Sequence, residues 1–250
     1  MPDFYNGGHS GSGPEVVLIH GAGCNHTVWR YQTRFFANRG FRVKAFDLPG
    51  HGSNRESPLD TVEEMAEWVA DRIEGRTAVI GHSLGGLVAL ELARTHPLLV
   101  ERLALLGCGR RIAVHPELQG RAGEQHPASV QMIVGWSYDI AGRIGGHPEP
   151  GTSPARVTSR LVESEIANLG RDLRATATYK FGEEAAKGLE VEALVVAGGR
   201  DRMVSATEVI AVADSIKGAT FTTIPAAGHF MMTDSPDPLR SAICSFLPER

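Results

Sequence analysis

The chain has 250 residues, of which 42% are hydrophobic and 22% charged, and its formal net charge is −4. This length can bury a hydrophobic core as one domain or two, and the composition is that of an ordinary globular protein. A disordered chain, a collagen-like fibre and a coiled coil are therefore excluded. Nucleic acid is not an expected partner, because a small acidic surplus leaves no basic footprint for a polyanion.

The cysteines and the apolar runs indicate the compartment. Cys24, Cys108 and Cys244 are odd in number and none belongs to a C-x-x-C pair, so we expect reduced and mostly buried thiols. The segment from Met1 to Pro14 has no basic run followed by an apolar stretch, and therefore no expected signal peptide. Runs such as Val16 to Ile19 are far shorter than the about 20 residues that span a bilayer. We expect a cytoplasmic protein with no membrane partner.

Short apolar runs that end at Gly or Pro alternate along the chain with longer segments of helical spacing. In chain order these runs predict a strand at Val16 to Ile19, a helix at about Thr27 to Asn38, a strand at Arg42 to Phe46, a helix that opens at Thr61, a strand at Ala78 to Ile80, a helix at Leu84 to Thr95 and a strand at Leu103 to Leu106. After a long interval they predict a strand at Ala193 to Ala197, a helix at Ala206 to Ile216, a strand at Thr220 to Ile224 and a helix at Pro238 to Phe246. This alternation predicts an α/β fold with a mostly parallel, doubly wound sheet.

The interval from about residue 110 to residue 187 contains no run typical of a strand. Helical spacing occurs at Pro127 to Asp139, at Pro154 to Leu169 and at Arg171 to Tyr179, with a Gly- and Pro-rich linker at Gly142 to Gly151. A structureless loop of this length would be unusual, so we predict a helical insertion. The expected organisation is a core of residues 1–109 and 188–250, with residues 110–187 forming a cap over the carboxyl edge of the sheet.

A G-x-S-x-G motif, Gly81-His82-Ser83-Leu84-Gly85, directly follows a predicted strand and opens a predicted helix. In this context the serine projects from a sharp turn as a nucleophile, and the glycines allow the close backbone approach that the turn requires. The backbone N–H of Leu84 is then placed to stabilise a developing oxyanion. We predict Ser83 as the catalytic nucleophile.

A serine nucleophile needs a base and a group that orients the base. His229 lies in the loop after the last predicted strand, and Asp201 lies in the loop after the preceding one, so both reach the edge where Ser83 emerges. The alternatives are a loop histidine without a role and an aspartate that pairs only with its arginine neighbours. The preferred prediction is a triad in the order Ser83, Asp201, His229.

The loop after the first predicted strand, His20-Gly21-Ala22-Gly23, completes the predicted site. Its small residues allow a close approach to substrate, and the N–H of Ala22 is the expected second oxyanion donor. We expect His20 to brace this loop rather than to transfer protons.

Together these pieces resemble the α/β-hydrolase superfamily over essentially the whole chain. Further matching pieces are Trp29, the segment Asp47-Leu48-Pro49-Gly50-His51-Gly52-Ser53, and Gly228-His229-Phe230. The general likeness is to small capped carboxylesterases and enol-lactone hydrolases. The resemblance implies that the Asp47 to Ser53 segment is a structural turn. One departure is the short front segment, Met1 to Gly13, which implies a truncated sheet of about six or seven strands.

The sharp turn that carries Ser83 is called the nucleophile elbow in this superfamily. The serine there distinguishes this chain from the haloalkane dehalogenases and epoxide hydrolases of the same fold, which place an aspartate at the elbow. The predicted activity is hydrolysis of a carboxylic ester, lactone or thioester of a small, largely apolar substrate through an acyl-enzyme. Two alternatives stay open: a ligand receptor that keeps the triad without turnover, and a C–C hydrolase, lyase or cofactor-free perhydrolase that uses the same triad. The candidate pocket residues are Cys24, Cys108, Met132, Trp136 and Phe230. Met132 and Trp136 could instead only pack the cap onto the core, and we expect the two cysteines to line the pocket rather than to act as second nucleophiles.

No cofactor or metal is expected. The histidines and cysteines lack ligand spacings such as H-E-x-x-H or paired C-x-x-C, and no Gly-rich phosphate loop follows a strand. The expected partner is a small ester-like molecule. The sequence leaves both a monomer and a homodimer open.

Overall fold

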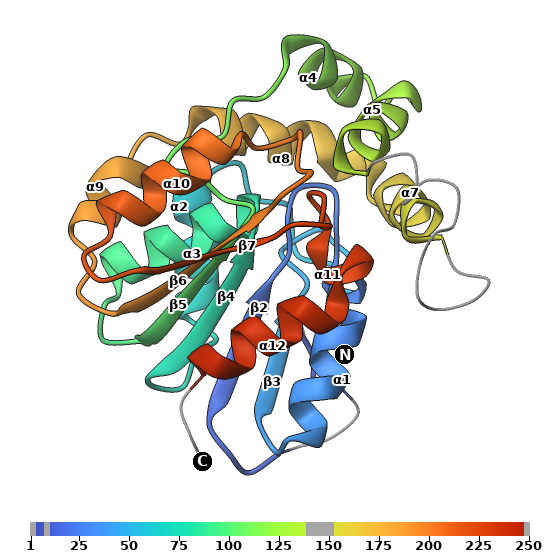
Figure 1. The fold of residues 1–250 in the computed structure, drawn as a ribbon. Helices are drawn as coiled ribbons and strands as arrows, with labels where there is room; N and C mark the ends of the chain where they lie inside the picture. The colour runs from blue at the N-terminus through green and yellow to red at the C-terminus, as the bar shows by residue number, and fades with distance from the viewer. Residues whose placement is uncertain (1–3, 8–10, 139–152, 248–250) are drawn as a thin grey trace.

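The computed structural model describes residues 4–7, 11–138 and 153–247. Their sheet has seven strands in the order β1-β3-β2-β4-β5-β6-β7, with β1 antiparallel to β3 and all other neighbours parallel (Figure 1). The strands are β1 (Phe4–Tyr5), β2 (Glu15–Ile19), β3 (Arg42–Phe46), β4 (Thr77–His82), β5 (Val100–Leu106), β6 (Glu192–Gly198) and β7 (Thr220–Ile224). The predicted α/β sheet of six or seven strands is confirmed.

Helices cover both faces of the sheet, as Figure 1 shows. They are α1 (Arg30–Asn38), α2 (Val62–Ala70), α3 (Leu84–Thr95), α10 (Ala206–Ser215) and α12 (Pro236–Phe246), with the short η1 (His26–Trp29) and α11 (Met231–Asp234) in loops. Val16 and Leu18 of β2 are buried with α1 and α12, whereas Val17 and Ile19 are buried with α2, α3 and α10. Strands buried on both faces are typical of parallel sheets.

Local signals set where the helices begin. The Thr61 side chain accepts a hydrogen bond from the N–H of Glu64 at 3.1 Å, and the Glu64 carboxylate accepts one from the N–H of Thr61 at 3.1 Å. This capping box satisfies two backbone groups that the first turn of α2 leaves without intrahelical partners.

Among the described helices, none combines the length and the apolar character needed to cross a bilayer.

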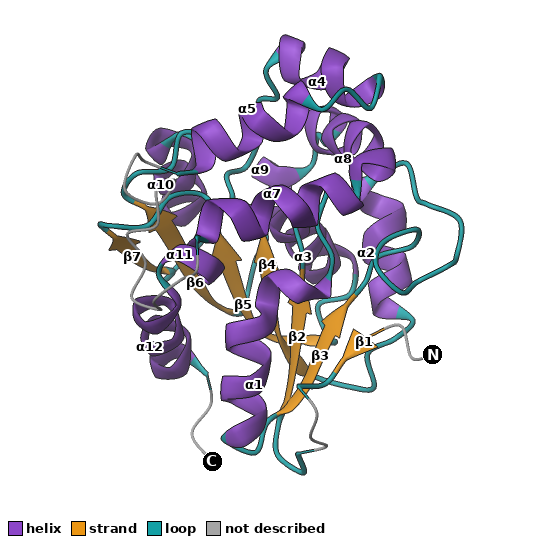
Figure 2. Ribbon diagram, turned by 90° about the vertical axis from the view of Figure 1, so that its right-hand side faces the viewer, coloured by secondary structure: helices purple, strands orange, loops and turns teal. Residues whose placement is uncertain are grey.

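Between β5 and β6 the described chain is helical. The helices are α4 (Pro116–Gly123), α5 (Ala128–Ser137), α7 (Pro154–Ser164), α8 (Ile166–Thr178) and α9 (Gly182–Lys187). Figure 2 shows α4, α5, α7 and α8 beyond the end of the sheet to which the strands point, whereas α9 packs on α3 and α10. The division of the chain at residues 110 and 187 into core and cap stays a prediction.

The structure corrects one helix of this insertion. The sequence predicts a single helix from Pro154 to Leu169, but α7 ends at Ser164 and α8 begins at Ile166. The residue at the break, Glu165, has its carboxylate buried against the core, where it accepts hydrogen bonds from Asn25 and Gly52. The predicted Gly142 to Gly151 linker lies outside the described residues.

Candidate active site

The turn between β4 and α3 holds Ser83 in a strained conformation. Its φ of 52° and ψ of −118° are rare for a residue with a side chain, and such strain is on the order of 1–3 kcal/mol. A Cβ on Gly81 would collide with the carbonyl oxygen of Gly85, and one on Gly85 would collide with that of Ile19. The turn therefore requires both glycines of the motif. The N–H of Ser83 donates to the carbonyl of Leu106 at 3.0 Å, which ties the elbow to β5.

The loops after β6 and β7 bring Asp201 and His229 together. The Nδ1 of His229 lies 2.8 Å from Oδ2 of Asp201, and the two side chains are only 4% and 3% exposed. The other carboxylate oxygen accepts from the N–H groups of Met203 and Val204 at 2.7 and 3.1 Å. These bonds fix the carboxylate, so Nδ1 of His229 carries the proton and Nε2 remains the basic nitrogen. Asp201 is thus not merely a surface partner of its arginine neighbours.

Two neighbours hold the backbone of His229. Its N–H donates to the carbonyl of Ser137, at the end of α5, at 3.1 Å. Its carbonyl accepts from Nε2 of His82 at 3.0 Å, and the two imidazole rings lie 4.6 Å apart. Burial, with the proximity of His229, lowers the pKa of His82 well below its usual value, so this imidazole is neutral. No role for His82 follows from its residue type alone, and its place between Gly81 and Ser83 is the sequence signal that could have indicated one.

The loop that follows β2 is braced as the sequence predicts. The Nε2 of His20 accepts a hydrogen bond from the N–H of Leu48 at 3.1 Å, and the Nδ1 of His20 lies 2.9 Å from the carbonyl oxygen of Gly21. Burial and the neighbouring His51 lower the pKa of His20 to about 4, which keeps this ring neutral. Among the described residues, no backbone hydrogen bond uses the N–H groups of Ala22 or Leu84, the two predicted oxyanion donors.

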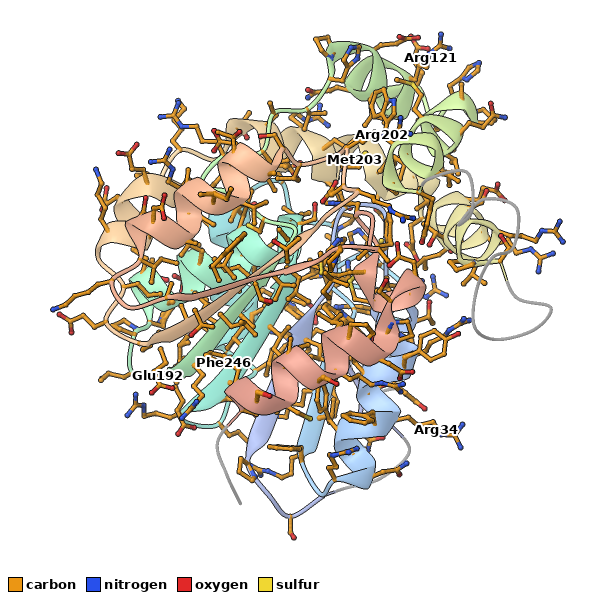
Figure 3. All side chains as sticks on the ribbon, viewed as in Figure 1. Arg34, Arg121, Glu192, Arg202, Met203 and Phe246 are labelled. Atoms are coloured by element: carbon orange, nitrogen blue, oxygen red, sulfur yellow. The ribbon has the colours of Figure 1, made fainter. Side chains whose placement is uncertain are left out.

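A cavity of about 450 Å³ lies over the elbow. Ser83, His229 and Ala22 line it, and so do Trp136 and Phe230, two of the predicted pocket residues. Most of the remaining wall is apolar: Ile112, Ala113, Val114, Pro116, Leu118, Ile133, Leu173, Met203 and Val204. Figure 3 shows Arg202 and Met203 beside α5, and Arg202 donates a hydrogen bond to the carbonyl of Gly135 in that helix.

Three predicted pocket residues lie outside this cavity lining. Met132 packs against the core cluster that contains α1 and α12. Cys24 and Cys108 are fully buried, and burial raises the pKa of each thiol well above its usual value. The reason is that the loops carrying these cysteines turn their side chains into the core rather than toward the cavity. Across the described residues, no group of three or more His, Cys, Asp or Glu side chains is arranged to hold a metal ion.

The sequence matches the model of the α/β hydrolase family over residues 16–242. The chain belongs to the α/β hydrolase family. A pimeloyl-(acyl-carrier protein) methyl ester esterase of Sodalis glossinidius is 31% identical over 243 residues, which cover 93% of each chain. Another protein of that name, from Nitrosomonas europaea, is 42% identical over 97 residues, 39% of this chain and 38% of the relative. The enol-lactonase of Burkholderia xenovorans LB400 has a similar fold, with a TM-score of 0.83, 24% identity and coverage of 96% of this chain and 93% of that one.

In this α/β hydrolase the segment from Asp47 to Ser53 is a structural turn, as the resemblance implies. The Asp47 carboxylate accepts from the N–H and hydroxyl of Ser53 at 2.8 and 2.9 Å and from the N–H of His26 at 2.7 Å. Burial alone would raise the pKa of Asp47, but hydrogen bonds from the imidazole of His26, at 2.9 Å, and from the N–H groups of His26 and Ser53 hold it well below its usual range. The turn is thereby fixed beside the loop that contains Ala22.

Proposed function

We propose that this α/β hydrolase cleaves a carboxylic ester through an acyl-enzyme formed on Ser83. The observation that carries the proposal is that Ser83, on its strained elbow, and His229, paired with Asp201, line the same cavity. A serine hydroxyl becomes an effective nucleophile only when a base removes its proton. The buried Asp201 orients that base and stabilises its protonated form.

The reaction has two halves. His229 takes the proton of the Ser83 hydroxyl as Oγ attacks the ester carbonyl, and the oxyanion lies against the N–H groups of Ala22 and Leu84. The tetrahedral intermediate then expels the alcohol, which leaves with the proton from His229. Water then attacks the acyl-enzyme and gives a proton to His229. The second tetrahedral intermediate breaks its bond to Oγ, the acid is released, and His229 returns the proton to Ser83.

The cavity wall supports a substrate with an apolar acyl group. Its lining is aliphatic and aromatic apart from the catalytic side chains and a few others, including His115, Thr176 and Arg202. The relatives named as methyl ester esterases suggest a small alcohol as the leaving group. Methyl esters of medium-chain acids are therefore the first substrates without a chromogenic leaving group to test, followed by lactones and thioesters.

The experiment combines covalent labelling with an ester series. A fluorophosphonate should label the native protein at Ser83, and Ser83→Ala should abolish both labelling and turnover of p-nitrophenyl esters from acetate to decanoate. Ser159→Ala, which changes a partly exposed serine of α7 outside the cavity lining, is the matched control and should keep both.

Two outcomes would replace the proposal. Absence of turnover across the series, with ligand affinity unchanged in Ser83→Ala, would favour a receptor. Untouched esters with cleavage of a vinylogous diketone would favour a C–C hydrolase.

A further inference from the structure

One face of α8 carries a polar stripe that is buried against the core. Asp172, in this helix, is fully buried, and its Oδ2 accepts hydrogen bonds from the N–H of Gly23 at 2.8 Å and from Nε2 of His51 at 3.0 Å. One turn earlier, Asn168 donates to the carbonyl of Gly50 at 2.8 Å. The stripe therefore bonds to two core loops at once: the turn that contains His51 and the loop that contains Ala22 and Gly23.

The contacts of His51 define its charge. Its Nδ1 lies 3.3 and 3.1 Å from the carbonyl oxygens of Leu48 and Pro49, and its Nε2 faces the Asp172 carboxylate. Because both ring nitrogens face only acceptors, both carry protons, and His51 is an imidazolium. Burial lowers the pKa of His51, but the charge and hydrogen bond of Asp172, with the charge of Glu165, outweigh burial and raise it to about 9. The hydrogen bond that joins His51 to Asp172 is therefore charge-assisted.

Gly23 is clamped between this network and the neighbouring helices. Its φ is +60°, and a Cβ there would lie 2.7 Å from Cδ1 of Leu169 and 3.5 Å from Cγ1 of Val162. The space that a side chain at this position would need is therefore filled by residues of α7 and α8, while the N–H of Gly23 is held by Asp172. Ala22, the proposed oxyanion donor, immediately precedes this clamped residue.

We propose that Asp172 is a positioning residue for catalysis, which holds the N–H of Ala22 in place for the oxyanion by fixing the backbone of Gly23. This inference rests on the proposed esterase function. His20 anchors one end of the four-residue loop to Leu48, and Asp172 anchors the other. Asp172 contacts no substrate in this role, since it is absent from the cavity lining. Its loss would disturb the transition state and leave ground-state binding nearly unchanged.

The test compares Asp172→Ala with Asp172→Asn in p-nitrophenyl butyrate hydrolysis. The alanine has no acceptor for the N–H of Gly23, whereas the asparagine keeps one carbonyl oxygen there. We expect kcat to fall by about 100-fold in Asp172→Ala, the order of effect of losing one oxyanion donor, with KM within about threefold of wild type. Asp172→Asn should recover kcat to within about fivefold of wild type.

Stability is measured alongside by circular dichroism, because both variants weaken a buried pair. A merely structural role would make kcat follow the loss of stability in both variants, without rescue by asparagine. If Asp172→Ala is unfolded at the assay temperature, Asp172→Leu replaces it, since leucine fills the same space without an acceptor. Glu124→Gln, which changes an exposed acid of the same insertion, is the matched control and should keep wild-type kinetics.

The results separate the two proposals. A wild-type protein without ester turnover refutes the proposed function. An active wild type whose folded Asp172→Ala or Asp172→Leu variant keeps kcat within threefold overturns the positioning role and leaves the esterase intact. A fall in kcat that asparagine does not relieve also overturns it.

Discussion

Raising the pH from 6.5 to 10 should lower the free energy of unfolding of this protein, because the native state holds a proton on His51. The pKa of His51 is raised from 6.5 to about 9, and the side chain is only 2% exposed, so solvent screens the pair little. The difference is 2.5 pH units, and each unit corresponds to about 1.4 kcal/mol. The proton on His51 therefore adds about 3.5 kcal/mol of stability at its full extent, a large fraction of the about 5–15 kcal/mol typical of a folded domain.

The sign follows from proton binding. Below pH 6.5 both the folded and the unfolded chain carry the proton, so the stabilisation is complete. Between pH 6.5 and about 9 the unfolded chain has released the proton while the native His51 keeps it, so stability falls as the pH rises. Above about 9 the contribution is lost.

The assay is urea unfolding at pH 6.5, 7.5, 8.5 and 9.5 for the wild type and for His51→Gln. The glutamine variant has no titrating group at this position, whereas Cys24 and Cys108, which ionise on unfolding, are common to both proteins. The difference in unfolding free energy between the two proteins should shrink by about 3 kcal/mol over this range. A difference that stays constant with pH would refute the charged state of His51.

Three further predictions concern the site and its scaffold. Asp201→Asn should lower kcat by about 10³- to 10⁴-fold in p-nitrophenyl acetate hydrolysis, because the amide favours the wrong tautomer of the His229 imidazole. The free energy of unfolding should change little, and full activity would exclude Asp201 from the triad. Gly81→Ala should lower the unfolding free energy by about 1–3 kcal/mol by calorimetry, because the added Cβ meets the carbonyl oxygen of Gly85. Thr61→Ala should lower it by about 1 kcal/mol in urea, since the N–H of Glu64 loses its cap, and an unchanged midpoint would contradict that reading.

The sequence is informative wherever function and fold depend on short-range patterns. The central strands lie within three residues of their predicted ends, because a strand buried on both faces is a short apolar run with sharp Gly or Pro limits. The place of Ser83 on the sharp turn is predictable because that turn requires glycines at fixed spacing. The proximity of Asp201 and His229 is predictable because the carboxyl ends of parallel strands meet at one edge, and their hydrogen bond agrees with that expectation.

Contacts between distant segments could not be predicted in the same way. The Asp172–His51 pair joins residues 121 positions apart, and nothing near either residue in the sequence indicates its partner. The break between α7 and α8 has the same origin, since Glu165 turns toward Asn25 across 140 positions. The direction of the Cys24 side chain, toward the cavity or toward the core, depends on the course of its loop. The apolar character of a cysteine does not specify that course.

The insertion bonds to each of the three loops that surround Ser83. Asp172 holds the loop of Ala22, the carbonyl of Ser137 holds the backbone of His229, and the carbonyl of Gly135 accepts from Arg202 beside Asp201. The same helices supply part of the cavity wall, for example Trp136 of α5 and Leu173 of α8. The segment that lines this cavity therefore also bonds to the loops that carry the proposed catalytic groups. Because Leu173 follows Asp172 directly, we expect substitutions at Leu173 to change turnover as well as substrate range.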